Sequence, residues 1–150
     1  MKGFALTGLF ALCCALALAA CRPTAAVLSP ADFRRSVGGT EWELVELQGQ
    51  PAPVGAGGRR ATIRFDADSA RVTGFAGCNR YFGSYSLGAD ELALTFGAVG
   101  MTKMACAQGM DLERLLGEAL TQTSRYTLQE GRLTLLDATG PRATFVRGSP

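Results

Sequence analysis

The chain has 150 residues, a formal net charge of +2 and no histidine. A chain of this length builds a single globular domain. The missing imidazole excludes Ser-His-Asp and Cys-His hydrolases and every zinc site that depends on histidine. The nearly balanced charge argues against a nucleic-acid-binding protein, which normally carries a basic patch and a high pI.

The first twenty residues have the pattern of a secretory signal, in which Lys2 precedes an apolar run from Phe4 to Ala20. The run ends in Leu18-Ala19-Ala20-Cys21, which resembles the lipobox of bacterial lipoproteins. We therefore expect residues 1–20 to be removed and Cys21 to carry the acyl chains that anchor the protein to the membrane. The alternative, an uncleaved anchor, needs about 20 apolar residues to span a bilayer, and this run is shorter. Because Arg22 follows, resemblance to sorting rules favours the outer membrane, facing the periplasm.

The remaining chain divides into a spacer and a domain. Residues 21–39 show no clear periodicity and are predicted to form a tether, whereas residues 40–147 form the domain. Alternating apolar residues predict about eight strands, which lie around residues 42–47, 61–65, 72–75, 81–87, 92–96, 126–128, 133–135 and 143–145. The Pro- and Gly-rich residues 48–58 are predicted to form a long mobile loop.

One amphipathic helix is predicted from Asp111 to Thr123, where leucines recur at three- and four-residue spacing. Asp111 is expected to accept hydrogen bonds from the first free backbone amides. The helix must bury its apolar stripe against the strands. We expect a mainly β (α+β) fold, a small, strongly curved antiparallel sheet or half-barrel with this helix packed on it.

Two cysteines remain beyond the expected anchor and signal, Cys78 and Cys106. Export delivers them to an oxidising compartment, so we expect a disulfide. The loop that it closes stabilises the folded chain by roughly 3.5 kcal/mol in the chain-entropy estimate. A redox or metal-binding pair is the alternative, but neither a CxxC spacing nor a histidine supports it.

Two sequence motifs surround these cysteines. They are Gly74-Phe75-Ala76-Gly77-Cys78-Asn79-Arg80-Tyr81-Phe82-Gly83-Ser84-Tyr85 and Met101-Thr102-Lys103-Met104-Ala105-Cys106. Together with the Trp42 strand before them and the helix after them, they resemble the META domain of HslJ-type lipoproteins, over nearly the whole chain to Phe145. The resemblance implies an exported, mostly antiparallel domain linked with heat shock and novobiocin resistance, without catalytic activity or cofactor. The residues that carry it are Gly77, Cys78, Asn79, Gly83, Tyr85, Thr102, Lys103, Met104 and Cys106.

Each motif has a structural and a functional interpretation. Gly77 and Asn79 can form a reactive site, but beside a bridged cysteine they more often form a tight turn. Lys103, with Thr102, can contact a ligand carboxylate or phosphate, or can cover apolar surface with its stem. The aromatic residues can line a ligand cavity or a docking patch, or can fill the core; they are Phe75, Tyr81, Phe82, Tyr85 and Phe96.

An enzyme would have to use carboxylates alone, such as Asp66 with Asp68 or Asp90 with Glu91, and both pairs fall in predicted turns. We therefore expect no catalytic and no metal-binding residues. The expected function is that of a non-enzymatic, lipid-anchored envelope protein, a stress- or drug-resistance-related accessory module that docks an envelope protein. The alternative is an apolar pocket in the curved sheet for a lipid or a small hydrophobic ligand.

Overall fold

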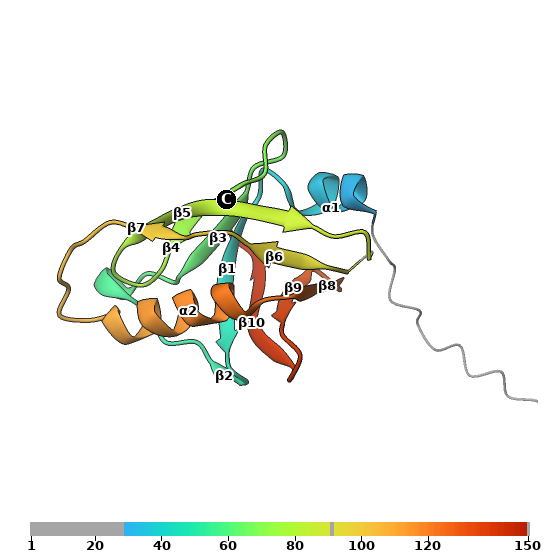
Figure 1. Cartoon of the computed structure of the whole chain (residues 1–150). Helices are drawn as coiled ribbons and strands as arrows, with labels where there is room; N and C mark the ends of the chain where they lie inside the picture. Colours follow the sequence, from blue (N-terminus) through green and yellow to red (C-terminus); the bar gives the residue numbers. More distant parts are fainter. Residues whose placement is uncertain (1–28, 91, 150) are drawn as a thin grey trace, which may run out of the picture.

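The computed structural model describes residues 29–90 and 92–149, which form one curved antiparallel sheet and two α-helices (Figure 1). Eight strands follow one another in the order β6-β5-β4-β3-β1-β10-β9-β8, and the short strands β2 and β7 pair with β1 and β5. The strands are β1 (Glu41–Leu47), β2 (Gln50–Pro51), β3 (Thr62–Phe65), β4 (Arg71–Phe75), β5 (Arg80–Leu87), β6 (Leu94–Phe96), β7 (Gly100–Met101), β8 (Arg125–Gln129), β9 (Arg132–Leu136) and β10 (Pro141–Arg147).

The two ends of this sheet meet and nearly close a barrel. Ala93 forms an antiparallel bridge with Arg125, and the Tyr126 amide donates a hydrogen bond to the Leu92 carbonyl. Helix α2 (Met110–Gln122) lies along the side that the strands leave open (Figure 1). The structure confirms the expected fold class, a strongly curved antiparallel sheet with one long amphipathic helix packed on it. This arrangement removes most of the exposed strand edges.

Helix α2 agrees with the predicted helix to within one residue at each end. Its buried stripe contains Leu112, Leu116, Ala119 and Leu120. Its N-cap is Gly109, with φ 91° and no side-chain cap hydrogen bond, so the prediction that Asp111 caps the helix is wrong. Asp111 instead lies in the first turn, where a carboxylate interacts favourably with the positive end of the helix dipole.

Residues 21–39 were predicted to be a tether, but the part that the structure describes contains helix α1 (Pro30–Val37). The Ser29 side chain accepts a hydrogen bond from the Asp32 amide, and Pro30 stands at the start of the helix, which are the usual signals of a helix N-terminus. Phe33 and Val37, four residues apart on one face, are fully buried. The folded domain therefore begins before residue 40. The prediction missed this helix because a helix this short shows too little periodicity to stand out in the sequence.

Residues 48–58 also contain more structure than predicted. The chain turns at Gln48 and Gly49, both with positive φ, and returns as β2, in which Pro51 pairs with Glu46 of β1. Proline is tolerated there because β2 is an edge strand. A short 3₁₀ helix, η1 (Ala56–Gly58), follows.

Aromatic side chains fill the interior of the barrel next to α1. The ring of Phe33 lies 5.3 Å from that of Phe65 and 4.6 Å from that of Tyr126, and the Phe65 ring lies 5.1 Å from that of Tyr85. Phe96, at 6.1 Å from Phe65, completes this aromatic cluster. The edge-to-face contacts of Phe65 with Phe33 and Tyr85 are favourable for aromatic rings. Tyr85 is therefore a core residue, and Phe96, which is partly buried, packs against the core.

Within residues 29–90 and 92–149, no helix combines the length and the apolar character that crossing a bilayer requires.

Candidate functional site

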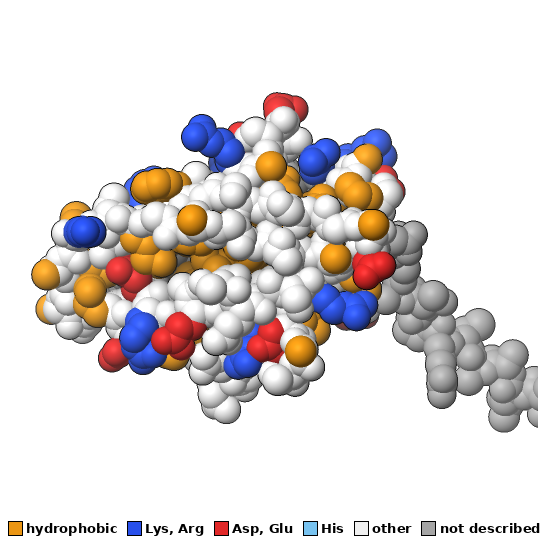
Figure 2. Space-filling model, viewed as in Figure 1, with side chains coloured by type: hydrophobic (Ala, Val, Ile, Leu, Met, Phe, Trp, Pro, Cys, Tyr) orange, Lys and Arg blue, Asp and Glu red, His pale blue; other side chains and the backbone are white. Residues whose placement is uncertain are grey.

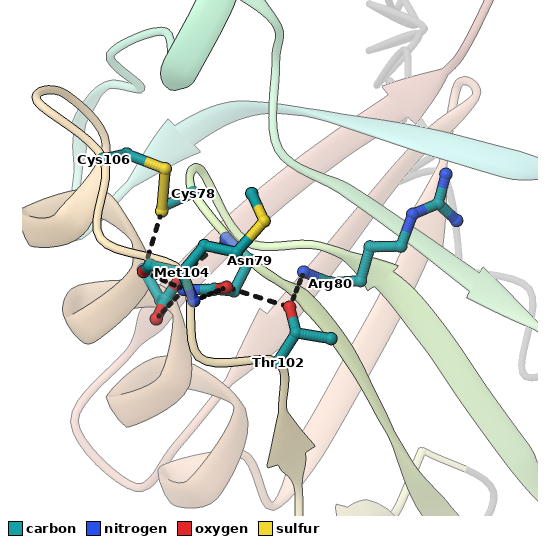
Figure 3. The surroundings of a disulfide bond; sticks show 7 residues. Cys78, Asn79, Arg80, Thr102, Met104 and Cys106 are labelled. Carbon is teal, nitrogen blue, oxygen red and sulfur yellow. Dashed lines mark hydrogen bonds between the residues drawn. A yellow bond between two sulfur atoms is a disulfide. The ribbon is translucent and has the colours of Figure 1, made fainter.

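The predicted disulfide between Cys78 and Cys106 is confirmed (Figure 3), with the two Cα atoms 5.8 Å apart. Cys78 lies in the turn between β4 and β5, and Cys106 lies in the loop between β7 and α2. The bond therefore fixes that loop to the end of the sheet, and Cys78 is almost completely buried.

Asn79 lies beside the disulfide, is only 2% exposed, and uses every hydrogen-bonding group of its side chain (Figure 3). Its Nδ2 donates to the Met104 carbonyl at 3.0 Å and to Oε1 of Glu113 at 3.1 Å. Its Oδ1 accepts from the Met104 amide at 2.7 Å and from the Thr102 hydroxyl at 2.9 Å. Its backbone amide donates to Oε2 of Glu113 at 2.7 Å. Asn79 thus joins the sheet, the loop and α2, and has no group left for a ligand.

Three glycines, Gly55, Gly77 and Gly109, allow three backbone segments to pass close to one another next to Cys78 and Asn79. Gly77 has φ 118°, and its carbonyl accepts a hydrogen bond from the Ala56 amide at 2.7 Å. A Cβ atom on Gly55 or on Gly109 would lie 2.2 Å from that carbonyl oxygen. The turn interpretation of Gly77 and Asn79 therefore accounts for both residues, and their role is structural.

An open groove of about 450 Å³ lies on the outer face of β3, β4 and β5. It reaches Arg80 and Thr102, which lie next to Asn79. The strand register arranges its side chains in rows across the sheet. One row contains Thr62, Phe75 and Arg80, and the next contains Arg64, Thr73 and Phe82. Arg71 and Ser84 form a third row, which borders the adjacent pocket. We call the four cations on or beside these rows, Arg59, Arg64, Arg71 and Arg80, the arginine face.

Two carboxylates lie opposite arginines of the arginine face, Glu41 opposite Arg64 and Asp66 opposite Arg71. The guanidinium of Arg59 lies 4.1 Å from the centre of the Phe75 ring and covers it. None of the four arginines forms an ion pair with a residue in the described ranges. Glu41, opposite Arg64 on β1, is the carboxylate that borders the groove. Basic side chains lie along the upper edge of the view, over β5 and over α1, and acidic side chains lie at the turn between them (Figure 2).

Asp66 lies opposite Arg71 in the third row, where the β3–β4 turn begins. Hydrogen bonds from the backbone amides of Ser69 and Asp68 hold the pKa of Asp66 below its usual value, and the nearby charge of Arg71 adds to the effect. The amides of Asp68 and Ser69 lie 2.9 and 2.8 Å from Oδ1 of Asp66. Asp66 therefore caps the turn, and its geometry gives no sign of a catalytic pair with Asp68.

An apolar surface continues from the arginine face around the end of the sheet. A second pocket, of about 480 Å³, is lined by Met101, Lys103, Met104 and Met110, and it shares Thr102 with the groove. Phe82, Met104 and Met110 are 59%, 60% and 46% exposed. We call Phe82, Met104 and Met110 the apolar patch; Figure 2 shows apolar side chains gathered at the left end, over β7 and the loop that follows it.

The structure brings several of the predicted contact residues together. Phe75, Tyr81, Phe82 and Thr102 border the groove, whereas Lys103 borders the second pocket. Tyr81 belongs mainly to the core, because its hydroxyl donates to the Thr62 carbonyl at 2.9 Å and its burial raises the pKa of the phenol.

Other predicted residues lie elsewhere. The Tyr85 hydroxyl donates to the Asp66 carbonyl inside the aromatic cluster, and Gly83 lies in β5 where the Ala98 carbonyl approaches the strand. Cys21 and Glu91 lie outside the described residues. Within the ranges that the structure covers, no group of three or more Cys, Asp or Glu residues could hold a metal ion.

Sequence reasoning missed the arginines of the groove. Arg64 and Arg71 occupy the polar positions of alternating strands, and this pattern alone is typical of any solvated sheet face. Their convergence depends on the register between β3 and β4, which pairs residues that are far apart in the chain.

The fold and the site together define a small antiparallel β-barrel domain with a filled interior, whose exposed cationic and apolar groups lie on its outer surface. The model of the META domain family matches residues 35–150, and the chain belongs to this family. The protein is similar to one from Burkholderia xenovorans solved by NMR, at 28% identity and a TM-score of 0.63, covering 86% of this chain and 98% of that one. It is also similar to a second NMR structure, at 25% identity and a TM-score of 0.58, covering 74% and 92% of the two chains. Comparison with curated proteins returns no match.

Proposed function

We propose that this META-domain protein is a non-enzymatic lipoprotein of the bacterial envelope, anchored through Cys21 to the outer membrane and facing the periplasm. It docks an envelope protein as an accessory module in stress or drug resistance. The filled interior supports binding on the outside of the barrel, because a ligand inside would have to displace closely packed rings such as Phe33 and Phe65. No observation favours the alternative of an apolar ligand pocket inside the sheet.

The observation that carries this proposal is the apolar patch. The exposed side chains of Phe82, Met104 and Met110 come from β5, from the disulfide-bonded loop and from the start of α2. They lie around one end of the sheet, where β7 pairs with β5 through Phe82 and Gly100. Isolated exposed apolar residues are common, but a cluster of aromatic and methionine side chains is typical of protein–protein contacts.

The position of the patch also suits a docking role. Pro30, where α1 begins, lies nine positions after Cys21. Even a fully extended chain therefore holds α1 within about 30 Å of an acylated Cys21. In Figure 1, α1 lies at one end of the molecule and β7 and η1 lie at the other. An anchor at Cys21 thus leaves the apolar patch free to face away from its own membrane.

Photocrosslinking in living cells tests this proposal. A photoreactive phenylalanine analogue replaces Phe82 in the full-length gene, and the same analogue at Gln129, an exposed position on β8, is the control. We expect a discrete crosslinked protein from position 82 and none from position 129. Equal crosslinking from both positions, or none from either, contradicts the docking role.

The anchor is tested separately in the same cells. Mass spectrometry of the membrane fraction is expected to show a mature chain that begins at an acylated Cys21, and Cys21→Ser is expected to abolish the acylation. An intact precursor mass, or membrane association that Cys21→Ser leaves unchanged, contradicts lipid anchoring.

A further inference from the structure

We propose that the arginine face binds acidic side chains of the partner, presented by an extended segment that carries carboxylates at every second position. This inference rests on the proposed function and adds the chemistry of the contact. It is carried by the spacing of the rows on the sheet, by four guanidinium groups that form no ion pair with a described residue, and by the position of the groove beside the apolar patch.

The spacing of the rows comes from β-strand geometry. Arg80, Arg64 and Arg71 belong to three successive rows on the same face of the sheet. Rows on one face lie two residues apart along a strand, which is about 6.6–6.8 Å. An extended peptide that runs parallel to the strands projects every second side chain toward the sheet, at the same interval. Each carboxylate of such a segment can therefore meet one row.

The lateral positions of the arginines bring their charges toward one line. Arg64 comes from β3, Arg71 from the central strand β4, and Arg80 from β5. Neighbouring strands are only about 4.8 Å apart, and arginine side chains are long enough to cross this distance. Arg59 already extends over Phe75 of β4. A segment that lies over β4 can thus contact all four guanidinium groups.

The chemistry of the groove favours carboxylates. Guanidinium groups bind carboxylates through paired hydrogen bonds in a fixed geometry, and the cations of the groove are all arginine. Thr73, in the middle row, adds a hydroxyl, and Phe82 beside it adds exposed apolar surface. The partner segment therefore combines carboxylates with an apolar residue that packs on Phe82.

Two carboxylates of the protein itself mark the limits of the site. Glu41 borders the groove from β1, and Asp66 lies opposite Arg71 in the third row, at the β3–β4 turn. They would repel an acidic segment that lay across the strands toward β1 or over the end of β3. The path that remains runs along β4, parallel to the strands, which is the direction that the row spacing requires.

Binding of short labelled peptides to the full chain, purified in a non-ionic detergent, tests the proposal. One peptide has glutamate at every second position, and its permuted partner has the same composition with the glutamates in one block. Fluorescence anisotropy at physiological salt is expected to show about fivefold to tenfold tighter binding of the alternating peptide. The double variant Arg64→Gln/Arg80→Gln is expected to weaken that binding by about tenfold, as the loss of two partly exposed ion pairs predicts.

A matched control keeps the change in charge the same. Arg114→Gln/Arg132→Gln also removes two positive charges, but these arginines pair with Glu118 and Glu46 outside the groove. We expect the control to bind the alternating peptide as the wild type does. Thermal unfolding of both variants checks that neither substitution disturbs the fold.

Three results would overturn the inference. Equal binding of the alternating and block peptides would mean that the arginine face attracts negative charge without recognising its spacing. Displacement of the peptide by low millimolar inorganic phosphate would make the groove a site for a free anion. Tighter binding to vesicles of anionic phospholipid than to the peptide would make the arginine face a membrane contact. If crosslinking from position 82 persists while the alternating peptide fails to bind, this inference fails and the proposed function stands.

Discussion

The two ends of the barrel are held together by different forces. At the α1 end, Phe33 closes the interior by packing against Phe65, Tyr85 and Tyr126, all fully or almost fully buried. At the disulfide end, Asn79 forms a hydrogen-bond network beside the Cys78–Cys106 bond. The α1 end depends on buried apolar area, whereas the disulfide end depends on polar contacts, close backbone crossings and a covalent link.

This difference explains where a binding surface can form. An end that is stabilised by packing must turn its large apolar side chains inward. An end that is stabilised by a disulfide and by backbone hydrogen bonds can leave large apolar side chains exposed to solvent. Met104 is an example of such a side chain. Its backbone amide and carbonyl both bond to Asn79, while its side chain is 60% exposed. The backbone of the loop is therefore held in place, while its apolar side chains remain at the surface.

Phe33→Ala is expected to give the largest effect, because it removes the ring that joins α1 to the aromatic cluster. Deletion of a buried phenylalanine ring costs about 3–5 kcal/mol of unfolding free energy. Urea denaturation of the full chain measures this loss. Phe82→Ala, at an exposed position, is the control and is expected to change the unfolding free energy by less than about 0.5 kcal/mol. Similar losses in the two variants would contradict the assignment of α1 to the core.

Replacing both cysteines, by Cys78→Ala/Cys106→Ala, is expected to destabilise the folded chain by about 3.5 kcal/mol. The physical reason is that the unfolded chain regains the freedom of a loop that spans 28 positions. Urea denaturation with and without reductant checks it: the wild type is expected to lose stability in reductant, while the variant does not change. An equal response of the two proteins to reductant would contradict the disulfide.

Asn79→Ala is expected to cost about 2 kcal/mol, because it leaves the Met104 amide without its hydrogen-bond acceptor and Glu113 without a side-chain donor. Asn79→Asp keeps the shape but places a second carboxylate beside Glu113, so it is expected to destabilise the protein more. Thermal unfolding of the two variants shows which of them is the less stable. If the aspartate variant were the more stable, the network as described would be wrong.

The sequence predicted the parts of this molecule that depend on local patterns. The long amphipathic stripe of α2 and the turn at Asp66 could be recognised because their signals lie within a few residues. The disulfide could be predicted because Cys78 and Cys106 are the two cysteines that lie outside the expected signal and lipobox. Helix α1 was missed because Phe33 and Val37 give a single apolar repeat, which a tether of the same composition could also contain. The arginine face was missed because it depends on the register that brings Arg64, Arg71 and Arg80 together from three strands.

Asp137, in the turn between β9 and β10, belongs to neither end and provides the smallest expected effect. A hydrogen bond from the Thr139 hydroxyl and the pairing with Arg142 lower the pKa of Asp137 to about 2. The unfolded chain has a carboxyl pKa near 3.9. The ionised carboxylate therefore stabilises the folded state fully above about pH 4, and this contribution is lost as the pH falls from about 4 toward 2. Asp137→Asn removes the charge, so the variant is expected to melt at a lower temperature than the wild type above pH 5. The two melting temperatures are expected to converge near pH 2, and a difference that stays constant across this range would show that the turn is held by shape alone.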